Sequence, residues 1–302
     1  MRRLRRVLVL LAVLAVIAGG VLLGVRTRAE AHKLVTNPME SRRLPGRTPI
    51  NDGLVYDDVH VTTSDGLQLQ GWFVPGSNGA VVIAQHGFRA DRGEMLNEAA
   101  MLHQHGYNVL ITSFRAHDLS DGDLITFGKL EPLDLDAWYR FASAHDGVDP
   151  NRIGLLGNSM GGSVALIYAA QNPHIKGVVA NSPFSSLDDT IETSVRFFTG
   201  LPPFPFAPLI KFWAEREAGF YAADVDVKKY IGKIGPRPVL LMQGGADVVI
   251  SRESGQRLFE AAAEPKELWF EPNVGHAGFD RAKPDEYERR VVGFFDRCLL
   301  GR

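Results

Sequence analysis

Residues 157–161 read Gly-Asn-Ser-Met-Gly and match the pattern G-x-S-x-G. They follow a short apolar run and precede a stretch of small residues that predicts a helix at 160–171. A strand, a sharp turn and a helix in this order form a nucleophile elbow, in which the turn holds the serine in a strained, accessible conformation. Flanking glycines let the strand and the helix approach without Cβ clashes. The predicted nucleophile is Ser159. The other residues of the predicted elbow are Gly157, Asn158 and Gly161.

A serine hydroxyl is a poor nucleophile without a base, and the base needs a carboxylate to orient it. Asp247 and His276 follow Ser159 in the chain order that α/β-type serine sites use, and each comes directly after a predicted strand. Active sites of open α/β sheets form at the carboxyl ends of the strands. We therefore predict His276 as the base and Asp247 as its partner. Asp280 and Asp224 are alternatives for the acid, although neither follows a strand.

The reaction also needs backbone N–H donors that hold a negatively charged oxygen. Met160, directly after the nucleophile, supplies one such group. The loop after the apolar run 81–84 reads Gln-His-Gly-Phe, and we predict that the N–H of Phe88 supplies the other. His86 precedes Ser159 in the chain, so it is expected to brace this loop rather than to act as the base.

Strands and helices alternate along the main part of the chain, which predicts βαβ units and a mostly parallel sheet with helices on both faces. A hairpin around Ser64-Asp65-Gly66 opens this part. The predicted strands are 55–62, 67–74, 81–84, 108–112, 152–156, 175–180, 238–242 and 266–270. The predicted helices are 92–105, 132–145, 160–171, 252–263 and 284–300.

A long insertion at about 183–236 interrupts this alternation and predicts a cap or lid. It contains seven of the 17 phenylalanines of the chain and several prolines. Two interpretations stay open: simple packing over the sheet, or an apolar wall that contacts an acyl chain or a membrane. The phenylalanines are Phe184, Phe197, Phe198, Phe204, Phe206, Phe212 and Phe220.

Residues 7–25 contain only Val, Leu, Ala, Ile and Gly. As a helix this run spans roughly 28 Å at ~1.5 Å per residue, close to the ~30 Å hydrocarbon core of a bilayer. We predict a transmembrane anchor at 1–28, a linker at 29–52 and a catalytic domain at 53–302. Four arginines before the run and two after it predict a cytoplasmic N-terminus and a catalytic domain outside. The alternative is a signal peptide cleaved near Ala29-Glu30-Ala31, which would release the protein.

The charge balance excludes some partners. The 302 residues carry 33 Lys and Arg against 35 Asp and Glu, and residues 1–28 hold six Arg and no acid. The rest of the chain therefore has a net charge of −8, which gives no reason to expect nucleic-acid binding. The single Cys298 excludes a disulfide framework and a Cys-based zinc finger. No phosphate-binding P-loop pattern occurs, and we expect neither a cofactor nor a metal ion.

These motifs together resemble the α/β-hydrolase superfamily, and within it the Bem46-like or prolyl-oligopeptidase-like serine hydrolases. The resemblance covers about 53–300 and implies an eight-stranded sheet, a cap and a Ser-His-Asp triad. One loop departs from it: relatives often read R-G-x-G-x-S, and residues 115–120 read Arg-Ala-His-Asp-Leu-Ser. The missing glycines put the shape of that loop in doubt. The matching segments are 71–75, 86–88, 157–161 and 237–241, with Asp247, Gly275 and His276.

The sequence thus predicts a membrane-anchored serine hydrolase that cleaves carboxylic ester bonds of apolar or lipid-like substrates through an acyl-enzyme. A serine peptidase or amidase of the same fold is one alternative. A non-catalytic binding protein on this fold is another, although all three triad residue types stand in the expected order.

Overall fold

One sheet organises the molecule, and the computed structural model describes residues 2–302 of it. The eight strands follow the order β1-β2-β4-β3-β5-β6-β7-β8. The pairs β1–β2 and β2–β4 are antiparallel and all others are parallel, so the predicted mostly parallel eight-stranded sheet is confirmed. The strands are β1 (Asp57–Thr62), β2 (Gln68–Val74), β3 (Val81–Gln85), β4 (Asn108–Thr112), β5 (Ile153–Asn158), β6 (Val178–Asn181), β7 (Val239–Gly244) and β8 (Lys266–Glu271).

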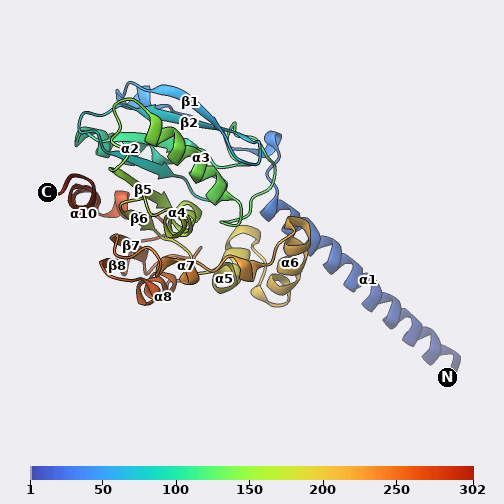
Figure 1. The fold of residues 1–302 in the computed structure, drawn as a ribbon. Coiled ribbons are helices and arrows are strands. Elements are labelled where there is room, and N and C mark those ends of the chain that lie inside the picture. The colour runs from blue at the N-terminus through green and yellow to red at the C-terminus, as the bar shows by residue number, and fades with distance from the viewer. Residues whose placement is uncertain (1) are drawn as a thin grey trace.

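Helices cover both faces of this sheet (Figure 1). One apolar core joins α3, α4, α7 and α8 to the first face, and another joins α2 and α10 to the second. The helices are α1 (Arg2–Val35), α2 (Leu96–Gln104), α3 (Glu131–Ala144), α4 (Met160–Gln171), α5 (Leu187–Thr199), α6 (Pro203–Ala218), α7 (Lys228–Ile231), α8 (Ser254–Ala261), α9 (Phe279–Ala282) and α10 (Pro284–Phe295).

Strands β3 to β7 are buried along their whole length, as expected for parallel strands covered on both faces. Their side chains alternate between the two cores. In β3, Val81 and Ile83 face the first core, and Val82 and Ala84 face the second. This close-packed sheet gives a rigid base to the loops that leave its carboxyl edge.

The cap lies between β6 and β7 and consists mainly of α5, α6 and the short α7, within the predicted insertion. Ser186 is the N-cap of α5, where its hydroxyl accepts the N–H of Asp189, and Gly200 ends the helix with a φ of 69°. The last turns of α1 pack on this cap. Ala31 is buried in a small apolar cluster with Val195, Ala207 and Ile210.

The N-terminal helix is longer than the sequence predicts. The apolar run predicts a helix at 7–25 and a linker from residue 29, whereas α1 continues to Val35. Two causes act together: residues 26–35 contain neither Gly nor Pro, and burial of Ala31 and Val35 against the body of the protein stabilises the last turns. Irregular chain with two short 3-10 turns (Met39–Ser41 and Pro49–Asp52) then leads to β1.

Among the residues described, α1 is the one helix that is long and apolar enough to cross a membrane. None of its most apolar window is buried, and Figure 1 shows it projecting away from the body of the protein toward the N-terminus. A soluble core helix of this composition would be covered on several sides.

Candidate active site

The turn after β5 carries Ser159 in a strained conformation. Its φ of 54° and ψ of −118° lie outside the regions that non-glycine residues favour. The backbone N–H of Ser159 donates to the carbonyl oxygen of Asn181 at 2.7 Å, which ties the turn to the end of β6. Ser159 also caps α4, so the helix begins directly behind it. This is the geometry of a nucleophile elbow.

The glycines of the motif are required by close backbone contacts. A Cβ on Gly157 would lie 2.4 Å from the carbonyl carbon of Gly161. A Cβ on Gly161 would lie 2.6 Å from the carbonyl oxygens of Gln85 and His86. The strand and helix of the elbow can therefore approach each other only because Gly157 lacks a side chain, and the elbow can pack against the end of β3 only because Gly161 does.

Asp247 and His276 meet at the same edge of the sheet. The Nδ1 atom of His276 lies 2.7 Å from Oδ2 of Asp247, whose side chain is fully buried. The other carboxylate oxygen, Oδ1, accepts the backbone N–H groups of Val249 at 2.8 Å and Ile250 at 2.9 Å. The carboxylate is thus fixed on both sides and orients the imidazole. The alternative acid Asp280 instead contacts Asn97 and Arg281.

Two free backbone donors lie beside the serine. Within residues 2–302, neither the N–H of Phe88 nor that of Met160 has an acceptor. A Cβ on Gly87 would lie 3.4 Å from the Cβ of Ser159, so the loop after β3 passes directly against this serine. Two unpaired N–H groups at this position are suited to hold an oxyanion.

Side chains behind this loop hold it in place. A carboxylate oxygen of the buried Glu94 accepts the N–H of Gly87 at 2.6 Å, and burial raises the pKa of Glu94. His86 accepts the N–H of Phe114 at Nε2 and contacts the carbonyl oxygen of Gly87 at Nδ1. Burial lowers the pKa of His86 to about 4, so the ring is neutral near pH 7. Both ring nitrogens are occupied by the backbone, which fits a bracing role.

The loop after β4 adopts a left-handed backbone at the two positions where the family pattern has glycine. Ala116 and Asp118 adopt φ values of 59° and 50°. His117, between them, accepts the N–H of Arg89 at 3.0 Å, and Asp118 forms a buried ion pair with Arg92 at 2.7 Å. These contacts hold the left-handed residues in place and connect the loop to the chain that follows Phe88.

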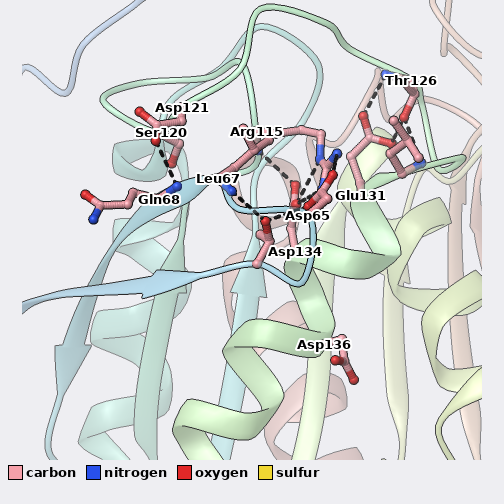
Figure 2. Close-up of polar contacts among 12 residues, drawn as sticks. Asp65, Leu67, Gln68, Arg115, Ser120, Asp121, Thr126, Glu131, Asp134 and Asp136 are labelled. Atoms are coloured by element: carbon pink, nitrogen blue, oxygen red, sulfur yellow. Dashed lines mark hydrogen bonds and ion pairs between the residues drawn. The ribbon is translucent and has the colours of Figure 1, made fainter.

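Figure 2 shows the outer part of the same loop. The Arg115 guanidinium lies between two carboxylates, 2.8 Å from Asp65 and 2.7 Å from Asp134. Glu131 accepts the backbone N–H groups of Thr126 and Gly128, each at 2.7 Å. Arg115 therefore joins the β1–β2 turn to α3, and residues of α3 hold the loop at its start and near its end.

An apolar cavity opens beside Ser159. It holds about 870 Å³ of empty space, part of it open to solvent, and runs between the sheet edge and the cap. Ser159, Met160 and Phe88 are among the residues that line it. Side chains of α5 and α6 form much of the wall, and Leu34 and Val35 of α1 contribute to it. The aromatic residues that line the cavity are Phe88, Phe127, Phe184, Phe198 and Phe220.

Some residues of this site were not predicted from the sequence. Ser182, directly after β6, accepts the N–H of Ala277 and so holds the loop that carries His276. Its position at the end of a strand is the one signal that points to it. Glu94 lies in the helical turn before α2 and carries no motif. Leu34 and Val35 belong to the segment predicted as a linker.

A nucleophile elbow after β5, a histidine after β8 and a cap over a mostly parallel sheet are the features of an α/β hydrolase. A family model described as Hydrolase_4, serine aminopeptidase S33, matches residues 76–203. The uncharacterized protein Rv2307c of Mycobacterium tuberculosis is 30% identical over 280 residues, which are 90% of this chain and 88% of that one. The uncharacterized protein YqkD of Bacillus subtilis is 29% identical over 78% of each chain.

The solved structure of the Pyrococcus furiosus esterase Pf2001 superposes with a TM-score of 0.75 at 30% identity, covering 88% of this chain and 98% of that one. The chain therefore belongs to the α/β-hydrolase superfamily, and it is a serine hydrolase of that fold.

Proposed function

We propose that this hydrolase cleaves carboxylic esters with an apolar acyl chain. Ser159 Oγ attacks the ester carbonyl while His276 Nε2 takes the hydroxyl proton, and Asp247 stabilises the imidazolium. The N–H groups of Phe88 and Met160 bind the oxyanion. Collapse breaks the bond to the alcohol, which leaves with the proton from His276. Water, activated by the same histidine, then hydrolyses the acyl-enzyme.

The observation that carries this proposal is the contact between Asp247 and His276 at the edge where the strained Ser159 opens into an apolar cavity. Almost all of the lining is apolar, and the two charged side chains in it already have partners. Lys211 pairs with Asp188, and Glu215 accepts the N–H of Ala222. An acyl chain fits such a wall because burying it removes apolar surface from water at no polar cost.

The family model's description, a serine aminopeptidase, makes an amidase the alternative activity. Recognition of a free amino terminus requires an unpaired carboxylate near the nucleophile. The carboxylates at the site have other partners: Glu94 holds Gly87, Asp247 holds His276, and Glu215 in the cavity wall accepts the N–H of Ala222. This arrangement favours the ester.

We further propose that α1 anchors the enzyme in a membrane with the catalytic domain outside the cytoplasm. The exposed apolar run and its length support the anchor, and the arginines at its N-terminal end support the orientation. Extraction of membranes with alkaline carbonate should leave the protein in the pellet. Protein recovered in the soluble fraction, lacking residues 1–31, would instead indicate a cleaved signal peptide.

The test of the chemistry is labelling of the purified full-length enzyme with a fluorophosphonate probe, together with a p-nitrophenyl ester series from acetate to dodecanoate. We expect labelling that disappears in Ser159→Ala, and activity that rises with chain length up to the capacity of the cavity. Labelling that survives in Ser159→Ala refutes the nucleophile. Faster turnover of aminoacyl p-nitroanilides than of esters favours the amidase, and no turnover of any activated substrate indicates a binding protein.

A further inference from the structure

The cap and the anchor helix run side by side in the same direction. Arg28 lies over the ring of Trp213, and His32 pairs with Glu217. Both pairs join residues 185 positions apart. The two helices therefore run in the same direction, with α6 along the C-terminal part of α1 (Figure 1).

The cap covers the end of the apolar run of α1. Residues 2–22 are exposed, whereas Leu23 and Gly24 are partly covered and Thr27 is buried. Ala31 lies in one apolar cluster with Ala207 and Ile210, so the chain that precedes these two residues lies beside the end of the apolar run. Residues 201–210 contain only Leu, Pro, Phe, Ala and Ile, and charged residues begin at Lys211.

The start of the cap helix therefore lies near the level at which α1 would leave the bilayer. The regular part of α6 begins at Pro205, after the non-helical Phe204. The partly covered Leu23 and Gly24 belong to the apolar run that ends at Val25, so the contact with the body of the protein begins inside this run and continues toward the catalytic domain.

The end of the cap near this level is exposed and apolar. Phe204 is 83% exposed and Phe197 is 51% exposed. No charged residue occurs from 197 to 210, which we call the cap tip. Phe212 and Trp213 follow the first charged residue of α6, Lys211, and each lies beside an arginine, as in the aromatic belt of membrane proteins.

We propose that the cap tip inserts into the lipid bilayer beside α1, in the leaflet that faces the catalytic domain, and that the acyl substrate enters the cavity from there. Phe198 connects the cap tip to the cavity. It is 42% exposed at the tip, it lines the cavity, and its ring centroid lies 5.0 Å from that of Phe88 in the loop after β3. The occupant of the exposed surface is the hydrocarbon and carbonyl region of the bilayer. This inference rests on the proposed membrane anchoring and ester hydrolysis.

The position of the tip is tested with an environment-sensitive label on single cysteines in full-length Cys298→Ala protein, reconstituted into phosphatidylcholine vesicles. The labelled variants are Phe204→Cys at the tip, Val16→Cys in the anchor and Val55→Cys as the solvent control. Val55 precedes β1, whose first residue pairs with the end of β2, at the sheet edge opposite the active site. Nitroxide lipids and aqueous iodide serve as quenchers.

We expect the label at 204 to be quenched by nitroxide lipids about threefold or more above the label at 55, and to be shielded from iodide. The proposal is overturned if the label at 204 behaves like that at 55 while the label at 16 is quenched by lipid. If the label at 16 is also unquenched, α1 does not span the bilayer, and both the anchoring and the insertion of the tip are wrong.

A functional comparison uses Phe204→Asp and the matched Val55→Asp. With a long-chain ester embedded in vesicles, Phe204→Asp should lower turnover about tenfold or more, since a charged tip is expelled from hydrocarbon. Turnover of a water-soluble short-chain ester should stay unchanged, and Val55→Asp should change neither. Equal loss on both esters, or on neither, overturns entry through the tip. A wild type that cleaves no ester refutes the proposed function, whereas the quenching data still decide the position of the tip.

Discussion

Asp247→Asn isolates the role of the carboxylate, because the structure fixes how an amide must sit at this position. The Oδ1 position accepts two backbone N–H groups, from Val249 and Ile250. An asparagine keeps both bonds only if its carbonyl oxygen takes that place. Its NH2 group then faces Nδ1 of His276, where Oδ2 stood at 2.7 Å.

That orientation forces the wrong tautomer on the base. Nδ1 must accept from the amide, so the ring proton moves to Nε2, and the histidine can no longer take the proton of Ser159. A serine active site whose histidine holds the wrong tautomer loses about 10⁴-fold in turnover, or about 5 kcal/mol of transition-state stabilisation. The fold keeps the two backbone bonds, so stability should fall by at most about 2 kcal/mol.

The assay is p-nitrophenyl ester hydrolysis by the purified variant, with thermal unfolding measured on the same sample. Asp280→Asn is the matched control, because Asp280 lies on α9 and contacts Asn97 rather than His276. It should leave turnover within about twofold of the wild type. A folded Asp247→Asn that keeps a tenth or more of wild-type turnover refutes the assigned role. A large loss in Asp280→Asn points to the other acid.

Three further predictions concern the rest of the molecule. Burial raises the pKa of Glu98 from 4.5 to about 7, so the folded state holds an extra proton between these values and stability falls as pH rises through them. Glu98→Gln should remove up to about 3 kcal/mol of this fall in the free energy of unfolding, measured with urea. A pH dependence of stability that is unchanged in the variant would contradict the raised pKa of Glu98. Asp118→Asn keeps a residue that tolerates a positive φ but leaves the buried Arg92 without its ion pair. This should lower the free energy of unfolding by about 3–5 kcal/mol in the same assay. A loss of stability below about 1 kcal/mol contradicts the ion pair. Ala214→Phe fills part of the cavity and should lower kcat/KM for dodecanoate about tenfold while sparing acetate, and a uniform loss would place the acyl chain elsewhere.

Much of the sheet could be predicted because the inner strands are buried on both faces. Burial of this kind demands continuous apolar runs, and runs such as 108–112 stand out between turn residues. The helix from Met160 to Gln171 was predictable for a similar reason, since the elbow sets its start. The ends of other elements depend on tertiary contacts. β7, for example, extends to Gly244, where β8 and the loop at Val274 pack closely against it.

The contact between α1 and the cap carried no usable sequence signal. A helix that is apolar on every side has no distinct face, so its pattern does not show which residues meet a partner. Leu34 and Val35 follow charged residues and are predicted as linker, yet they line the cavity, because the last turns of α1 pack along α6. Only the arrangement in space relates the end of α1 to the wall of the site.

The sequence predicts backbone strain at Ser159 alone, but the structure has strained residues in several loops at the carboxyl edge of the sheet. The non-glycine residues with a positive φ in the described chain all follow the carboxyl ends of β3, β4, β5, β6 or β8. Each such residue costs about 1–3 kcal/mol and persists only where its surroundings fix it. Ser182 and Ala277 illustrate this, because they bond to each other across two loops. The inner sheet lacks such residues and can hold these loops rigid, which keeps Asp247 and His276 in contact at the edge where Ser159 lies. The residues concerned are Arg89, Ala116, Asp118, Phe127, Ser159, Ser182 and Ala277.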